Sequence, residues 1–403
     1  MNKFFPWLMV MIAMLALTFS NGMGITGLPI FDQSLLDAFG WDRENLKRGP
    51  FITFALTALL APIAGIVIDK VGVKKVMALG FLLLTISYYL LSQMQSLTDM
   101  YIAYALLGAM LACAGLNANM ILVSSWFQKN RGTAIGLALV GTSLGGTIMP
   151  QIGNQLIARF DWRTAFQYEM FIAVAMLTLV ILVVRNTPQG NGNAESSAPA
   201  FAAISDDDIS YSAALRTGTF WALAIIAMTT FYTVLAISSH LILHLTDFKF
   251  ERQMAANALS TFFICAMVGK FLFGFLADLI DQKKVLMANL VVMLSGAVCL
   301  ALMNPATLWL AVIPLGFGWG GIYTLIQLTA INSFGLSSAG KILGTITILD
   351  ALGGGMGIWL TGYLYETSGK SYALAFQIFC GMLILALLAA TRIRQVKRVA
   401  EPA

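Results

Sequence analysis

The stretch GIVIDKVGVKK at residues 65–75 recurs in altered form as GFLADLIDQKK at residues 274–284. Both copies hold a glycine, an aspartate and a pair of lysines at the same spacing, and the two copies are 209 residues apart. Each copy connects two long apolar runs. A polar loop that recurs at one internal spacing indicates a duplicated chain with two similar halves.

The loop pattern suits a tight turn that fastens neighbouring helices. Gly72 can adopt a positive φ, and Asp69 can accept hydrogen bonds from a helix N-terminus or pair with a base. We expect a latch that breaks as the halves of the molecule rock. An ordinary basic loop on the cytoplasmic side is the alternative. The predicted latch residues are Gly65, Asp69, Lys70, Lys74, Lys75, Gly274, Asp278, Lys283 and Lys284. Asp281 replaces the loop glycine in the second copy, which predicts a looser latch there.

Outside these loops the chain is apolar. Only 11% of its residues are charged and 59% are hydrophobic, whereas soluble domains carry roughly 25% charged residues. A membrane-spanning helix needs about 20 apolar residues. The sequence predicts an all-α integral membrane protein with twelve transmembrane helices in two pseudo-symmetric six-helix bundles. The predicted spans are Phe5–Phe31, Pro50–Ile68, Val76–Met94, Met100–Trp126, Thr133–Ile157, Phe166–Val184, Phe220–Leu245, Ala255–Ala277, Val285–Met303, Thr307–Ser333, Leu343–Tyr365 and Tyr372–Ala390.

The distribution of basic residues predicts the orientation. With both termini in the cytoplasm, the inner loops hold most of the 24 lysines and arginines, as the positive-inside rule requires. The net charge of +5 is therefore no sign of nucleic-acid binding. A polar stretch rich in Gly, Ser and Asp predicts a flexible linker between the bundles. The predicted parts are an N-terminal bundle (1–185), a cytoplasmic linker (186–216), a C-terminal bundle (217–391) and a cytoplasmic tail (392–403).

The doubled loop motif resembles that of the major facilitator superfamily. Other stretches resemble its monocarboxylate and oxalate–formate exchanger branch: FGWDREN (39–45), RGTAIGLALVGTSLGG (131–146), DWRTAF (161–166), SSHLILHLTDFKFERQMAA (238–256), GKILGTITILDALGGGMG (340–357) and YETSGKSYALAF (365–376). The resemblance implies a bacterial inner-membrane transporter, often a monomer, that works by alternating access around a central cavity. In this branch a cation four residues before the loop glycine of span eight binds the substrate carboxylate. The matching residue is Lys270, where the family usually has arginine.

Lys270 also stands out on physical grounds, because a charge in mid-membrane normally faces a cavity or a partner. It lies eight residues before Asp278, and Asp350 lies nine residues after Lys341, which puts both charges at a similar depth of about 12–14 Å. Asp350 is therefore the predicted partner of Lys270 and a candidate proton carrier. A permanent ion pair between the two spans is the alternative. The opposite charge of Asp350, where oxalate–formate exchangers carry a second cation, favours a monoanion as substrate.

Other polar residues are candidates for the cavity wall. His240, four residues before His244, is a predicted substrate or proton site, and satisfaction by local contacts is the alternative. Asn117 matches the family's polar position in span four. Trp319 and Tyr323 share a helical face beside glycines that leave space, although plain packing also explains them.

We therefore expect a secondary active transporter of a small organic anion, such as lactate or pyruvate, with a proton as coupling ion. Two alternatives stay open: exchange or efflux of larger organic anions or amphipathic compounds, and a transport-inactive metabolite receptor that docks a partner through its acidic linker. The sequence has no GxxxxGK[ST] or HExxH motif and no catalytic Ser/His/Asp arrangement. We expect no enzyme activity, no cofactor and no metal, and membrane lipid as the surroundings.

Overall fold

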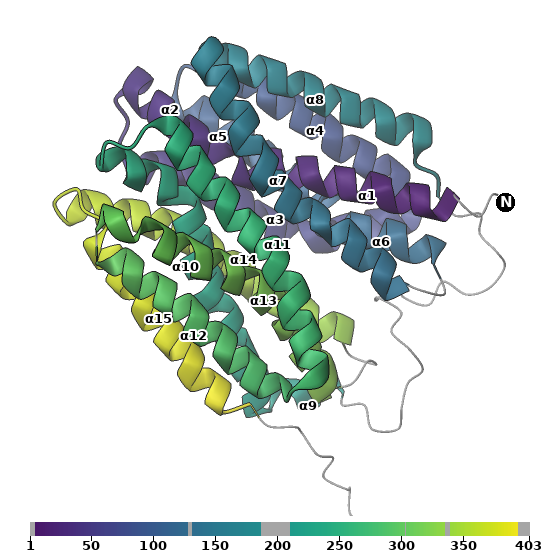
Figure 1. Ribbon diagram of the computed structural model, residues 1–403. Helices are drawn as coiled ribbons and strands as arrows, with labels where there is room; N and C mark the ends of the chain where they lie inside the picture. The colour runs from purple at the N-terminus through teal and green to yellow at the C-terminus, as the bar shows by residue number, and fades with distance from the viewer. Residues whose placement is uncertain (1–4, 128–130, 187–209, 303, 335–338, 394–403) are drawn as a thin grey trace, which may run out of the picture. The chain divides into compact units, whose positions relative to one another are not determined.

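A computed structural model of the chain describes residues 5–127, 131–186, 210–302, 304–334 and 339–393 (Figure 1). Over these residues the regular structure is helical. Twelve helical segments are long and apolar enough to cross a membrane, which confirms the predicted all-α membrane fold. Most of the predicted linker, with its acidic run at 206–208, and most of the predicted tail lie outside the described residues.

The first half of the chain supplies six of these spans. Span one combines α1 (Phe5–Asn21), a π-helical turn η1 (Gly22–Thr26), a short η2 (Leu28–Phe31) and α2 (Asp32–Phe39). The next spans are α3 (Arg43–Val71), α4 (Val73–Gln93), the pair α5 (Leu97–Ala114) and α6 (Leu116–Trp126), α7 (Arg131–Arg159) and α8 (Trp162–Val183).

The second half begins with a short helix, α9 (Tyr211–Leu215). The spans that follow are α10 (Gly218–Asp247), α11 (Arg252–Leu279), α12 (Gln282–Ala301), η3 (Pro305–Thr307) with α13 (Leu308–Phe334), α14 (Ala339–Thr367) and α15 (Ala373–Thr391).

Local hydrogen bonds fix where several helices begin. Asp42, Ser96 and Asp161 precede α3, α5 and α8, and each side chain accepts a hydrogen bond from the backbone three residues on. Such caps satisfy backbone donors that the helix itself leaves unpaired. The hydrogen bond from the Thr164 backbone holds the pKa of the Asp161 carboxyl below its ordinary value.

Span four is interrupted at Gly115, between α5 and α6. Asn119 satisfies backbone carbonyls at the interruption, because its Nδ2 donates to the carbonyls of Ala114 and Gly115 at 2.9 and 2.8 Å. These carbonyls lie at the end of α5, where acceptors lack partners within the helix. Asn119 therefore bonds the backbone of its own span rather than a neighbouring helix.

The described chain forms two compact units. Unit 1 comprises Met1–Ser197, Ala236–Ile264 and Ile358–Tyr372, and unit 2 comprises the remaining segments. Parts of α10, α11 and α14 therefore belong to unit 1 together with α1–α8. The predicted bundles at residues 1–185 and 217–391 are continuous halves of the sequence, whereas the compact units combine separate segments. The predicted division therefore stays a prediction.

The packing repeats between the halves. In unit 1, α4 packs against α5 and α8, and in unit 2, α12 packs against α13 and α15 (Figure 1). In each half, therefore, the third span contacts the fourth and the sixth. This agreement of contacts supports the duplication that the repeated loop indicates.

Candidate functional site

The predicted site residues fall into both compact units. Lys270, Trp319, Tyr323 and Asp350 belong to unit 2, whereas His240 and Asn117 belong to unit 1.

In unit 2, Lys270 lies where α11 and α13 approach backbone to backbone. A Cβ atom on Gly320 would lie only 2.8 Å from the backbone nitrogen of Lys270, so glycine is required at this crossing. The span-ten glycines were expected to leave open space, but Gly318, Gly320 and Gly321 are filled by contacts with α11 and α12. The lysine side chain itself is half-buried.

Aromatic rings and a carboxylate surround Tyr323, one helical turn further along α13. The rings of Trp319 and Tyr323 are 6.5 Å apart, and Phe231 of α10 lies edge-on to Trp319 at 4.7 Å. Asp350 of α14 is half-buried and close enough to Tyr323 to interact with it electrostatically. Helices α10, α13 and α14 thus bring Phe231, Trp319 and Asp350 close to Tyr323. The predicted pairing of Lys270 with Asp350 stays a prediction.

In unit 1, the candidate residue Asn117 and its neighbour Asn119 differ in environment. Asn117 on α6 is exposed, whereas Asn119 is fully buried against the helix interruption. Of the two, only Asn117 is exposed, because side chains two residues apart on a helix point about 200° apart.

His240 is buried, and both of its ring nitrogens have partners. Nε2 lies 2.9 Å from the Ile358 carbonyl oxygen and Nδ1 lies 3.0 Å from the Tyr372 hydroxyl. Since a carbonyl can only accept, Nε2 carries the hydrogen and Nδ1 accepts one from Tyr372. Burial raises the pKa of the Tyr372 phenol, which keeps this donor in place at neutral pH. The contacts are those of a satisfied neutral imidazole.

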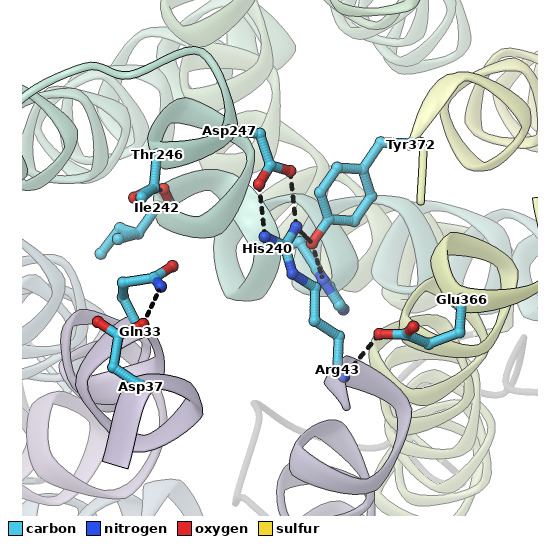
Figure 2. Close-up of polar contacts among 9 residues, drawn as sticks. All are labelled: Gln33, Asp37, Arg43, His240, Ile242, Thr246, Asp247, Glu366 and Tyr372. Atoms are coloured by element: carbon cyan, nitrogen blue, oxygen red, sulfur yellow. Dashed lines mark hydrogen bonds and ion pairs between the residues drawn. The ribbon is translucent and has the colours of Figure 1, made fainter. Parts of the chain in front are cut away.

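Figure 2 shows that Tyr372 connects His240 to Arg43, which begins α3. Arg43 forms a two-pronged ion pair with Asp247 at 2.5 and 2.7 Å and donates to the Tyr372 hydroxyl at 2.9 Å. Its backbone nitrogen donates to Glu366 at 2.9 Å. The parts of α10 and α14 in unit 1 are thereby joined to the start of α3.

A second buried ion pair lies one helical turn further along α3. Lys47 Nζ contacts Asp32 Oδ2 at 2.5 Å, and both side chains are at most 4% exposed. The same nitrogen donates to the carbonyl and the hydroxyl of Ser239 at 2.6 and 2.9 Å. Asp32 begins α2 and Ser239 lies on α10, so one ammonium joins three spans.

Sequence reasoning missed Arg43, Lys47 and Asp32 because it assigned them to the loop between spans one and two. Their partners are far away in the chain: Asp247 is 204 residues from Arg43 and Ser239 is 192 residues from Lys47. Two signals were present. Asp42 is a helix cap, and the spacing of Arg43 and Lys47 puts both side chains on one helical face.

The two latch loops use different contacts. In the first copy, Gly72 has φ +85°, as expected, and the side chain of Asn186 packs against it and accepts from the Lys74 backbone at 3.1 Å. In the second copy, Asp281 caps α12 through the Lys284 backbone at 3.1 Å. Gly65 and Gly274 are half-buried, and Asp69, Lys70, Lys75 and Asp278 are exposed.

Lys283 makes a further contact in the second copy: its Nζ donates to the carbonyls of Thr391 and Ile393 at 2.7 and 2.9 Å. These carbonyls lie at the C-terminal end of α15, where a cation is favourable. The role of the loops as conformational latches stays a prediction.

Twelve spans, a duplicated packing pattern and charged side chains within the spans define a polytopic transport protein. The profile of the Major Facilitator Superfamily matches residues 11–358 and 245–403. The chain belongs to this superfamily, and it is a transporter.

Relatives and solved structures agree with this assignment. The chain is 24% identical to "Monocarboxylate transporter 13" of Bos taurus over 94% of its own length and 87% of the relative. It is also 24% identical to "Uncharacterized MFS-type transporter YhjX" of Escherichia coli over 73% of each chain. A match to "Riboflavin transporter RibJ" of Trypanosoma brucei is 28% identical but covers 36% of this chain and 27% of the relative.

Among solved structures, a bacterial homologue of the human lysosomal transporter Spinster in an inward-facing and unoccupied conformation has a TM-score of 0.74. It is 16% identical and covers 98% of this chain and 97% of that chain. At this identity the likeness concerns the fold. Together with the full-length match to a monocarboxylate transporter, it confirms the resemblance that the sequence motifs indicated.

Proposed function

We propose that this protein is a proton-coupled transporter of a small organic monoanion, such as lactate or pyruvate, in a bacterial inner membrane. The observation that carries the proposal is Lys270, a basic side chain half-buried within a membrane-spanning helix. A charge at that depth is costly unless it meets a counter-charge or a ligand. The match to monocarboxylate transporters over nearly the whole chain favours a carboxylate as that ligand.

In this proposal Lys270 binds the substrate carboxylate, and Tyr323 donates a hydrogen bond to it. Lysine acts as a point charge rather than as a fork, which suits a single carboxylate. Trp319 and Phe231 supply the apolar wall, while Asn117 and His240 are further polar contacts. Asp350 carries the proton: once neutral, it no longer competes with the anion for Lys270, so proton and substrate bind cooperatively.

The alternating-access cycle gives the latch residues their proposed role. Asp69 and Asp278 hold the cytoplasmic ends of neighbouring helices in one state and release them in the other. Both termini then lie in the cytoplasm, and a single chain suffices for transport.

The test is uptake of labelled lactate into proteoliposomes with an inward proton gradient. We expect saturable uptake that collapses with the gradient. Lys270→Ala should reduce the ratio of maximal rate to half-saturation concentration by about 30-fold, because a charge-assisted hydrogen bond contributes about 2 kcal/mol. Lys270→Arg should restore much of it. Asp350→Asn should abolish gradient-driven accumulation but leave lactate exchange intact.

Lys341→Ala is the matched control, since Lys341 is an exposed lysine on α14. It should transport like the parent protein. If Lys270→Ala transports normally, or if Asp350→Asn still accumulates lactate against its gradient, the corresponding role is refuted.

The partial match to a riboflavin transporter favours one second candidate, a larger organic anion or amphipathic compound. A panel of unlabelled competitors separates the two. Competition by short monocarboxylates supports the first proposal, whereas competition only by larger ring compounds supports the second.

A further inference from the structure

The ion pair between Lys47 and Asp32 is buried and fully coordinated. An ammonium has three hydrogens, and Lys47 directs them to Asp32 Oδ2, the Ser239 carbonyl and the Ser239 hydroxyl. Lys47 is 1% exposed and Asp32 is 3% exposed, so neither charge is stabilised by bulk water. The pair is stable only while all three partners stay in contact.

Two of the three acceptors belong to α10. A movement of α10 away from α3 removes both Ser239 contacts and leaves the ammonium with one acceptor. Breaking a buried charged cluster is strongly unfavourable unless water or another ligand replaces the lost partners. The contact therefore holds α10 against α3 and α2 as long as Lys47 is charged and Asp32 balances it.

The other titratable groups near the pair lie on α3, α10 and α5. From α3, Arg43 is paired with Asp247, and from α10, His240 is bonded on both ring nitrogens. From α5, the Tyr104 phenol lies near Asp32, and an ordinary phenol is neutral near pH 7. Asp32 is thus the one carboxylate that contacts Lys47 within the described residues.

Protonation of Asp32 removes the negative charge that neutralises the Lys47 ammonium. The neutral acid leaves Lys47 as an uncompensated cation in a dry site, which the closed arrangement cannot accommodate. Once α10 and α3 separate, water hydrates the ammonium and the acid together. Proton binding is therefore compatible with the separated arrangement and incompatible with the closed one.

We propose that Asp32 is a proton-binding site, and that a proton taken up there from the outer side releases the Lys47–Ser239 contact and separates α10 from α3. The contact forms again only after the proton has left Asp32, which couples proton passage to closure. This inference rests on the proposed proton coupling and adds to it a second site, distinct from Asp350. The ligand is the proton itself.

The test measures the distance between spin labels at Ala38→Cys and Glu251→Cys, with the four native cysteines replaced, in purified protein without substrate. Both labelled residues are exposed, one on α2 and one just before α11. We expect a longer distance to become populated as the pH falls from 8 to 5. Because one proton is linked to the change, the ratio of long to short populations should rise by up to about tenfold per pH unit.

Asp32→Asn should abolish this pH response and favour the long distance at every pH. The double variant Asp32→Asn/Lys47→Gln, which is neutral and similar in shape, should also be insensitive to pH but keep the short distance. It decides the question if the single variant does not fold. Glu44→Gln is the matched control, because Glu44 forms an exposed pair with Arg48 on the same helix, and it should respond like the parent protein.

A pH-independent distance in the parent protein, or an unchanged pH response in either Asp32 variant, would overturn the inference. The readout does not depend on the substrate. If lactate is not transported but the pH response disappears with Asp32→Asn, the proposed substrate fails and the proton site stands. If lactate is transported but the distance ignores pH, the proton site fails alone.

Discussion

Arg43 shows how one side chain can join segments that are far apart in the sequence. Its guanidinium binds both oxygens of Asp247 and the Tyr372 hydroxyl, and it lies over the ring of Tyr365 at 4.0 Å. Only a planar fork of five donors can make these contacts together. Since the arginine is 7% exposed, each contact is made in surroundings where a charged hydrogen bond is strong.

Replacing Arg43 by lysine tests this geometry. Lysine keeps the charge but can bind only one carboxylate oxygen well, and it loses the planar stacking on Tyr365. We expect Arg43→Lys to destabilise the protein by about 2 kcal/mol, the contribution of a hydrogen bond to a charged group. Thermal unfolding in detergent, followed by intrinsic fluorescence, measures the change.

Arg48→Lys is the comparison for this variant. Arg48 is 45% exposed in its pair with Glu44, so the exchange should change stability by less than about 0.5 kcal/mol. An equal effect at the two positions would mean that the fork geometry of Arg43 contributes nothing.

The sequence predicted the roles of individual residues less well than it predicted the helices and the fold. Lys270 is recognisable because a charge in the middle of a long apolar run is unusual. Lys47 and Asp32 are not, because they lie at the edges of apolar runs, where charges normally face water. Their burial depends on Ser239, 192 residues away from Lys47, and no local pattern encodes that contact.

At the scale of elements, helix existence follows from apolar length, whereas helix ends and interruptions depend on hydrogen bonds. The run of residues 50–68 predicts a span, yet α3 begins at Arg43 because Asp42 caps it there. Pro50 lies inside this helix rather than at its start. Span four was predicted as one continuous helix, but it is interrupted at Gly115 and held by Asn119.

The interruption of span four leads to a prediction about Asn119. Asn119→Leu leaves the carbonyls of Ala114 and Gly115 without the amide that now binds them. Buried acceptors without partners are costly, so we expect a loss of about 2 kcal/mol in stability. Asn119→Asp should not restore full stability, because an ionised carboxylate cannot donate to carbonyls and the protonated acid has one donor hydrogen for two carbonyls.

Asn117→Leu is the control for stability, since Asn117 is exposed on the same short helix. Its unfolding temperature should stay within a degree or two of the parent value, whereas that of Asn119→Leu should fall clearly. Equal unfolding temperatures for the two leucine variants would contradict the role given to Asn119.

At the scale of the whole molecule, the fold is the feature that the sequence predicted best. Twelve apolar runs and a doubled loop are properties of composition and spacing. Both can be recognised even when the predicted helix boundaries are wrong by a few residues. The profile of the superfamily and the solved structures agree with them. The substrate is a different matter, because it depends on a few side chains whose arrangement the spacing of motifs does not determine.

The orientation in the membrane is open to direct measurement. A cysteine at Glu251, in a protein without its native cysteines, should react with a membrane-impermeant maleimide on intact cells. A cysteine at Lys75, on the side rich in basic residues, should react only after the membrane is permeabilised. Both residues are exposed, so accessibility within the protein does not limit the reaction.

The loops at residues 65–75 and 274–284 make similar contacts through different residues. In the first half, Asn186, just beyond α8, holds the backbone at Lys74. In the second half, Lys283 holds the carbonyls at the end of α15. Each loop thus fastens the last span of its own half. If a six-span ancestor already had a contact between this loop and its last span, both halves would have inherited that contact. The residues that form it would then have changed separately in each half.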